Sequence, residues 1–174
     1  AVVSSKPGTT RDRIVGEVRS DNRSFTLVDT GGLEPAFEDP LNGKVRQQVF
    51  TALGEADLIL FVTDGEHGLN PIDSDIAFQL RCLAKPLLLV VNKVDNVQRE
   101  RNGPEFHSLG LGDPILISAY HNLGVYDLVE TICRSLPVTG PAKHDTSLPK
   151  IALVGRTNVG KSMLANAILG QNRS

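Results

Sequence analysis

The sequence predicts an α/β fold built on a doubly wound, mostly parallel sheet. Three short apolar runs carry this prediction, because strands covered by helices on both faces are apolar throughout instead of alternating. They are DLILFVT at 57–63, PLLLVV at 86–91 and PILIS at 114–118. Segments with helical periodicity lie between or after them, at 71–83 and 124–136. Regular alternation of strands and helices is typical of this class of fold.

The N-terminal part of the chain predicts a hairpin followed by a helix. Residues 13–19 and 24–29 alternate apolar and polar side chains on either side of Asp21 and Asn22. This pattern indicates two antiparallel strands, the second ending at Asp29. Residues 41–55 carry apolar side chains at helical spacing, so we expect an amphipathic helix there.

The C-terminal part begins with a break in this pattern. Residues 137–149, PVTGPAKHDTSLP, contain three prolines and a glycine among polar residues, which is typical of a linker. KIALV at 150–154 predicts another buried strand, and a glycine-rich turn leads from it into a helix that continues to residue 170.

Composition excludes several classes of protein. The chain has 174 residues, about the length of one ordinary α/β domain, and 40% of them are hydrophobic. Its net charge of −2 gives no bulk electrostatic case for nucleic-acid binding. The longest apolar run is far shorter than the ~20 residues of a membrane-spanning helix, so no membrane association is expected. Cys82 and Cys133 lie in apolar helical segments, which predicts reduced packing residues of a cytoplasmic protein.

The strongest motif is a phosphate loop. GRTNVGKS at 155–162 fits G-x-x-x-x-G-K-[ST] and lies between a predicted strand and a predicted helix. Gly155 and Gly160 allow backbone N–H groups to surround phosphate oxygens at a helix N-terminus. Lys161 would reach the β- and γ-phosphates, and the Ser162 hydroxyl would bind Mg²⁺. The alternative is an ordinary glycine-rich turn between a strand and a helix.

A second motif, NKVD at 92–95, follows the PLLLVV strand and selects the base. The Asp95 carboxylate can accept two hydrogen bonds from N1–H and the 2-amino group of guanine. Adenine has no such donors, so it would leave this carboxylate desolvated and unpaired. Asn92 would orient the loop and the stem of Lys93 would lie against the base. Taken alone, NKVD is better explained as a solvated strand end than as a base-binding motif. In combination with a phosphate loop, it indicates that the nucleotide is a guanine nucleotide.

Three shorter segments complete the set. Asp29, at the end of a strand, is placed to hold Mg²⁺ through water, and the Gly32 N–H to meet a γ-phosphate. In PGTTRD at 7–12, the Thr10 hydroxyl would bind Mg²⁺ when the γ-phosphate is present. Ser118 and Ala119 would present backbone N–H groups to the guanine O6. Each segment alone is more simply explained as a turn.

Together these motifs resemble the Der (EngA) family of bacterial tandem GTPases. PGTTRD, DTGGLEP, LILFVTDGEHGLNPID and VVNKVD are similar to the first G domain of that family. SAYHNLGVYDL, a linker and KIALVGRTNVGKSMLANAILG resemble the passage from its first G domain into its second. The resemblance implies a P-loop GTPase fold, GTP hydrolysis with Mg²⁺, and a role in assembling the large ribosomal subunit.

The resemblance also assigns further residues. Leu33 stands where other GTPases have a water-orienting Gln, so it cannot perform that task. The resemblance implies that Asn158 binds a K⁺ ion that assists hydrolysis, although a simple turn former is the alternative. Val159 and Met163 belong to the expected nucleotide-binding positions of the loop. The four histidines, His67, His107, His121 and His144, lack ligand spacing and are expected at the surface or in loops.

The order of the motifs departs from the family, in which each G domain begins with its own phosphate loop. We therefore expect residues 1–136 to form a first G domain without that strand and helix, 137–149 a linker, and 150–174 the start of a second G domain. This indicates a piece of a longer protein. The missing strand is central in such sheets, and the thirteen-residue linker reaches about 43 Å when extended. We therefore expect 150–170 to dock into the empty position and complete a permuted G domain.

Three functions remain open from the sequence. The first is a Mg²⁺-dependent GTPase assisted by K⁺, and the second is a binding module that nucleotide state controls. The third is an inert piece of the GTPase without activity of its own.

Overall fold

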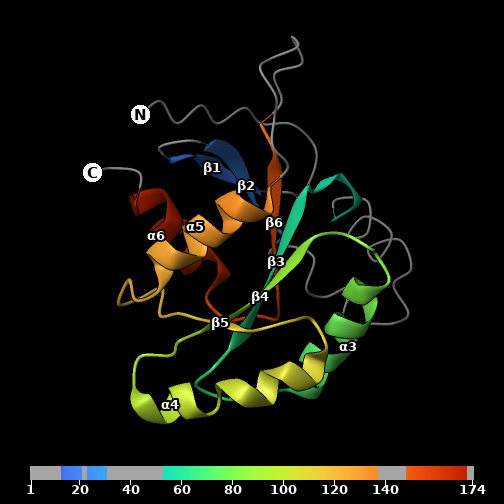
Figure 1. Cartoon of the computed structure of the whole chain (residues 1–174), viewed down its shortest axis with the longest axis vertical. Helices are drawn as coiled ribbons and strands as arrows, with labels where there is room; N and C mark the ends of the chain where they lie inside the picture. The colour runs from blue at the N-terminus through green and yellow to red at the C-terminus, as the bar shows by residue number, and fades with distance from the viewer. Residues whose placement is uncertain (1–12, 21–22, 31–52, 137–147, 172–174) are drawn as a thin grey trace.

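The computed structural model describes residues 13–20, 23–30, 53–136 and 148–171. Eleven named elements lie in this part of the chain (Figure 1). In chain order they are β1 (Arg13–Ser20), β2 (Arg23–Asp29), β3 (Leu58–Asp64), α3 (Pro71–Arg81), β4 (Leu87–Asn92), α4 (Val97–Arg101), the 3-10 helix η1 (Gly103–Leu109), β5 (Ile115–Leu116), α5 (Val125–Ser135), β6 (Lys150–Val154) and α6 (Lys161–Gln171).

The six strands form one sheet in the order β1-β2-β6-β3-β4-β5. Only the β1–β2 pair is antiparallel in this sheet, and all other neighbouring pairs are parallel. The carboxyl ends of β2, β6, β3, β4 and β5 therefore meet at one edge. The predicted fold class is confirmed.

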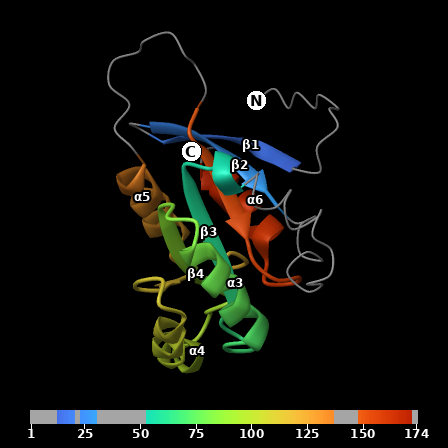
Figure 2. The ribbon, with the colours of Figure 1, turned by 90° about the vertical axis from the view of Figure 1, so that its right-hand side faces the viewer.

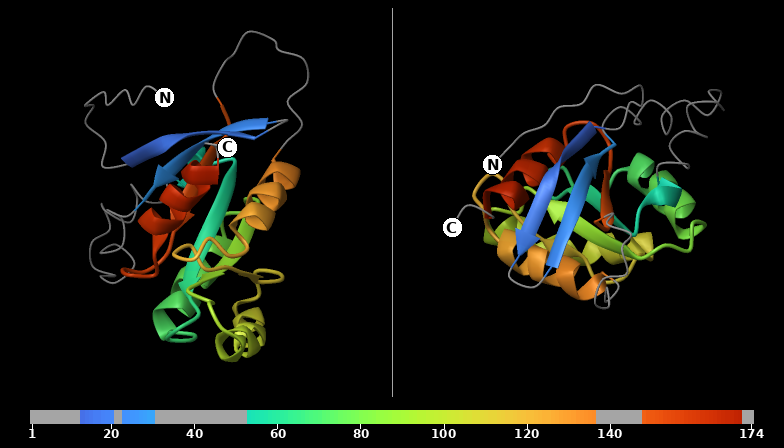
Figure 3. Two further views of the ribbon diagram at one scale, coloured as in Figure 1. Left: turned by 90° about the vertical axis from the view of Figure 1, so that its left-hand side faces the viewer. Right: turned by 90° about the horizontal axis from the view of Figure 1, so that it is seen from above.

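Helices cover both faces of the sheet. Figure 1 shows α5 and α6 on one side of the strands and α3 on the other, and Figure 2 views the molecule from the α3 side. One buried cluster joins the sheet to α5 and α6, with Leu128 and Ile168 among its members. A second cluster joins the sheet to α3 and η1 through Ile76 and Phe106. Figure 3 shows α6 against the β1–β2 hairpin.

Strand β6, from the C-terminal part of the sequence, lies in the middle of the sheet. It pairs in parallel with β2 on one side, where Val28 faces Ala152, and with β3 on the other, where Ile59 faces Ala152. Ile151 and Leu153 belong to the first buried cluster, whereas Ala152 and Val154 belong to the second. Because alternate side chains enter both cores, an apolar strand such as KIALV suits this position.

Most element predictions agree with the structure. The hairpin, the two long apolar runs, β6 and the helices at 71–81, 125–135 and 161–171 lie within two residues of the expected bounds. The third run is wrong in length, because β5 covers only Ile115–Leu116. Its continuation turns back at Ser118, which forms an isolated antiparallel bridge with Leu123. Of the predicted helix at 41–55, only 53–55 lie within the described residues, and these are helical.

The two cysteines differ from the prediction. Cys133 is half-buried and packs against the first cluster, as expected. Cys82 is exposed, so its prediction as a packing residue is wrong. The reason is that α3 ends at Arg81 and Cys82 caps it, away from the buried stripe of the helix. In the described part of the chain, no helix combines the length and apolar character that crossing a bilayer requires.

Candidate functional site

The predicted site residues gather where the parallel strands end. Asp29 is the last residue of β2, Asn92 is the last of β4, and Gly155 directly follows β6. In open parallel sheets, loops at the carboxyl edge form the ligand crevice. Thr10, Gly32 and Leu33 lie outside the described residues, as does His144.

The loop at 155–160 has a backbone that requires glycine at both ends. Gly155 has φ +153°, and a Cβ there would lie 2.1 Å from the carbonyl oxygen of Val62. Gly160 has φ +94°, and a Cβ there would lie 2.4 Å from Nδ2 of Asn92. Any side chain would push the loop away from β3 and from the end of β4. Between them, the exposed Asn158 also has a left-handed backbone, with φ +64°.

Lys161 is buried beneath this loop. Its Nζ donates to the carbonyl oxygens of Gly155 and Arg156, both at 2.8 Å. Burial lowers the pKa of Lys161 to about 8, against the opposing attraction of the Asp29 carboxylate. A cation in this position costs desolvation energy that an incoming anion would recover. The geometry therefore favours binding of phosphate.

Ser162 and Asp29 meet across the end of the sheet. The Ser162 hydroxyl donates to Oδ2 of Asp29 at 3.0 Å, although 133 positions separate the two residues. Thr30 adds a second contact between these segments, because its hydroxyl donates to the carbonyl oxygen of Leu153 at 2.5 Å. Two oxygen groups of the type that Mg²⁺ prefers thus lie side by side next to the loop.

Asn92 ties three loops together from the end of β4. Its Nδ2 donates to the carbonyl oxygen of Val159 at 2.8 Å, and its Oδ1 accepts from the Ala119 backbone N–H at 2.9 Å. Asn92 is 2% exposed, and Val159, Ser118 and Ala119 are also buried. The NKVD loop, the SA loop and the phosphate loop therefore form one unit. Met163, also predicted for this site, is exposed on the first turn of α6.

Asp95 lies at the outer side of this unit with its side chain 29% exposed. Its Oδ1 accepts from Nη1 of Arg99 at 2.7 Å and from Nδ2 of Asn96 at 2.9 Å. Nε2 of His121 lies 3.8 Å from Oδ2. Arg99 also bonds to Glu66, so the carboxylate of Asp95 is held in a defined orientation.

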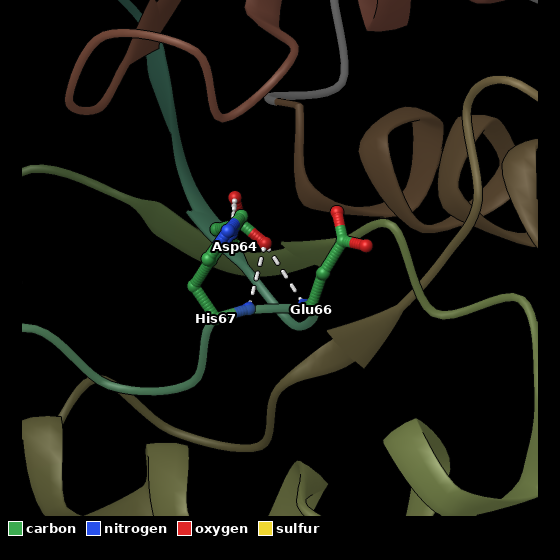
Figure 4. Close-up of side chains that lie close together, drawn as sticks. All are labelled: Asp64, Glu66 and His67. Atoms are coloured by element: carbon green, nitrogen blue, oxygen red, sulfur yellow. Dashed lines mark hydrogen bonds and ion pairs between the residues drawn. The ribbon is translucent and has the colours of Figure 1, made fainter.

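The sequence reasoning missed Asp64, which anchors Lys93. Oδ2 of Asp64 accepts from Nζ of Lys93 at 2.7 Å and lies 3.0 Å from Nδ1 of His67. Oδ1 accepts from the backbone N–H groups of Glu66 and His67 (Figure 4). Burial by itself raises the pKa of Asp64, but these hydrogen bonds outweigh it and lower the pKa to about 2.

Asp64, Glu66 and His67 are close enough for a metal site, although the sequence suggested no ligand spacing for His67. The Lys93 ammonium already neutralises the Asp64 carboxylate, so we interpret the three residues as a hydrogen-bonded cluster and not as a metal site. Asp64 follows an apolar run and lies within the LILFVTDGEHGLNPID stretch, but neither feature gave it a role in advance.

The described histidines are exposed, as predicted. The side chains of His67, His107 and His121 are about half-exposed or more.

Comparison with known proteins identifies the family. The model of the family described as "50S ribosome-binding GTPase" matches residues 1–93 and 150–174. The chain belongs to this family. Its two matched segments are those that supply the NK end of β4 and the phosphate loop.

Curated relatives have the name that the sequence resemblance implied. The chain is 43% identical to the GTPase Der of Clostridium tetani over 174 residues, which is 100% of this chain and 40% of that protein. It is 42% identical to the GTPase Der of Alkaliphilus oremlandii, covering 99% of this chain and 39% of that protein. The predicted resemblance to the Der family is confirmed. The chain spans about 40% of the length of these relatives.

A solved structure has a similar fold. Era in complex with MgGDPNP and nucleotides 1506–1542 of 16S ribosomal RNA aligns with a TM-score of 0.62 and 29% identity. The alignment covers 85% of this chain and 52% of that one. This likeness supports the P-loop GTPase fold.

Proposed function

We propose that this chain binds GDP and GTP with Mg²⁺ and that the protein hydrolyses GTP. The observation that carries the proposal is the pair of hydrogen bonds made by Asn92, to Val159 and to Ala119. These bonds hold the base-selecting loop next to the phosphate loop. That arrangement suits a ligand that carries both a base and phosphates, which is a nucleotide. Family membership supports the same conclusion.

We propose that the site is completed by the C-terminal segment of this chain. Residues 1–136 would form a G domain without its own phosphate-loop strand and helix, 137–149 a linker, and 150–174 the segment that supplies them. The position of β6 between β2 and β3 supports this division. So does the Ser162–Asp29 hydrogen bond, which joins the two parts at the site.

In the proposed complex, the phosphates occupy the loop at 155–160. Lys161 supplies a buried positive charge to the β- and γ-phosphates, and the loop backbone supplies N–H donors. Ser162 would bind Mg²⁺, with Asp29 holding it through water and Thr10 joining when GTP is bound. The ion supplies charge neutralisation between the phosphates. The Gly32 N–H would meet the γ-phosphate.

The base is selected by the NKVD and SA loops. Asp95 would accept from the guanine N1–H and 2-amino groups. In this structure the backbone N–H of Ser118 donates to Leu123 and that of Ala119 donates to Asn92, so a contact with O6 would require these N–H groups to be shared with the base. The stem of Lys93 lies along the base while its ammonium pairs with Asp64. Arg99 holds Asp95 from the side and leaves lone pairs of the carboxylate for the base.

Two further parts of the proposal concern hydrolysis and partners. With Leu33 in place of a Gln, K⁺ held by Asn158 would supply the positive charge that assists hydrolysis; the exposed position of Asn158 in the loop is compatible with this role. We also propose a cytoplasmic protein that acts in large-subunit ribosome assembly. The family description and the ribosomal RNA bound in the Era structure support a ribosomal role.

The test is a titration of the chain with fluorescent mant-GDP, followed by Asp95→Asn. In xanthine a carbonyl replaces the 2-amino group, and the amide of Asn can donate to it. We expect Asp95→Asn to lose GDP affinity by about 100-fold and to gain affinity for xanthosine diphosphate (XDP). The reason is that a ligand which leaves buried polar groups of the site without hydrogen bonds binds much more weakly. Absence of GDP binding by the wild-type chain would contradict the proposal. Replacing K⁺ by Na⁺ during GTP turnover tests the cation separately.

A further inference from the structure

A buried ion pair joins the phosphate loop to helix α3. Nε of Arg156, the second residue of the loop, donates to Oδ1 of Asp73 at 2.9 Å. The Asp73 side chain is 0% exposed and that of Arg156 is 16% exposed. Within the described residues, Nη2 of Arg156 is buried without a hydrogen-bond partner, so the Nε bond is the contact that anchors the guanidinium.

Asp73 has a second task on its own helix. Its Oδ2 accepts from the Asn70 backbone N–H at 3.2 Å, while the Asn70 side chain accepts from the N–H of Ile72. The Asn70 backbone N–H thus holds the carboxylate, while the Asn70 side chain caps the first turn of α3. Burial raises the pKa of Asp73, and the Arg156 guanidinium opposes that effect. A fixed, buried carboxylate is costly without its cation, so it restricts where Arg156 can lie.

The anchored residue also touches the phosphate-binding lysine. The carbonyl oxygen of Arg156 is one of the two groups that accept from Nζ of Lys161. A chain of contacts thus runs from the Asp73 carboxylate through the Arg156 side chain and backbone to the Lys161 ammonium. The other carbonyl, from Gly155, is already fixed by the close approach to Val62.

We infer that Asp73 and Arg156 are positioning residues for the phosphate loop, setting its backbone and Lys161 for the β-phosphate of a nucleotide. The inference rests on the proposed function. It assigns a binding role to Asp73, which ends a stretch of the family resemblance that had no role, and to a loop position that the phosphate-loop pattern leaves unspecified.

The experiment separates phosphate positioning from stability by comparing GDP with GMP, which lacks the β-phosphate. Affinity for GDP is measured with mant-GDP, and affinity for GMP by displacement of mant-GDP. For Arg156→Met we expect GDP affinity to fall about tenfold, which is ~1.4 kcal/mol, with GMP affinity unchanged. The matched control is Asn70→Ala, which removes the cap of α3 and leaves the ion pair. It should lower the unfolding temperature and leave the ratio of GDP to GMP affinity at the wild-type value.

A double variant keeps the test valid if Arg156→Met folds poorly. Arg156→Met with Asp73→Asn leaves no unpaired buried charge, so stability should recover. We expect its ratio of GDP to GMP affinity to stay about tenfold below wild type. If that ratio returns to the wild-type value with stability, the pair is merely structural and the inference is wrong. If the wild-type chain binds no GDP, the proposed function fails as well, which is a distinct result.

Discussion

The side-chain amide of Asn92 donates to the carbonyl oxygen of Val159 over 2.8 Å, although 67 positions separate the two residues. The same amide accepts from the Ala119 N–H. One buried side chain therefore holds the end of β4, the phosphate loop and the SA loop in register. Neither Val159 nor Ala119 needs a particular side chain for this contact, because both use backbone groups.

Replacing this side chain should cost both stability and binding. Asn92→Ala leaves the Val159 carbonyl and the Ala119 N–H buried without their partner, so we expect a loss of about 2–4 kcal/mol in unfolding free energy. GDP affinity should fall by about 10- to 100-fold. Urea denaturation and mant-GDP titration measure the two effects. As a control, Asn70→Ala removes the N-cap of α3 and should reduce stability without changing GDP affinity. If wild type and Asn92→Ala bind GDP equally well, Asn92 does not bridge the loops of the site.

GDP affinity should decrease at alkaline pH because of Lys161. Its pKa is about 8 in the unliganded chain, and bound phosphates favour the ammonium form. Above pH 8 binding must therefore include uptake of a proton, which costs about tenfold in affinity between pH 7 and pH 9. Mant-GDP titrations across this range give the profile. GMP has the same base and no β-phosphate, so its affinity should change much less with pH. If the affinities of GDP and GMP change in parallel, Lys161 is not the group that causes the pH dependence.

Most of the fold could be predicted because its strands are apolar throughout. The LILFVT and LLLVV segments are buried from two sides, a pattern that hardly depends on their neighbours. Helix α4 was missed for the opposite reason. Val97–Arg101 has no buried residue, and caps and ion pairs of Arg99 hold it in place instead of an apolar stripe.

The site was predicted as far as local motifs extend. Residues 155–162 and 92–95 carry fixed spacings that name their chemistry. Asp64 and Asp73 were missed because each acts on a partner from another segment. Asp64 pairs with Lys93 across 29 positions and Asp73 with Arg156 across 83. The residue spacing within one segment cannot predict a contact with another segment. These pairs meet only because the parallel sheet brings their segments together.

The Asp64 carboxylate should make stability depend on pH in acid. Its pKa of about 2 in the folded chain lies below the ordinary 3.8. As pH falls, the Asp64 carboxylate is therefore protonated at a higher pH in the unfolded chain than in the folded chain. The stabilisation present above pH 4 is lost as pH falls from 4 to 2. We expect Asp64→Asn to cost about 2 kcal/mol at pH 7 and much less near pH 2.5, by urea denaturation. Asp75→Asn, an exposed change on α3, should follow the wild-type curve.

Unfolding should also show whether β6 is an integral part of the domain. Leu153 is fully buried in the cluster shared with α5 and α6. If 150–170 completes the sheet in solution, Leu153→Ala should lower the unfolding free energy of the whole domain by about 2–5 kcal/mol. Val97→Ala, a truncation of a side chain 65% exposed, should change it by less than about 0.5 kcal/mol.

Limited proteolysis gives an independent readout of the same arrangement. A strand paired on both sides is a poor substrate, so 150–170 should resist cleavage as well as β3 and β4 do, and GDP should increase the resistance. Leu153→Ala should expose this segment first. Rapid cleavage throughout 150–174 in the wild-type chain, unchanged by GDP, would show that the C-terminal strand does not occupy the position between β2 and β3.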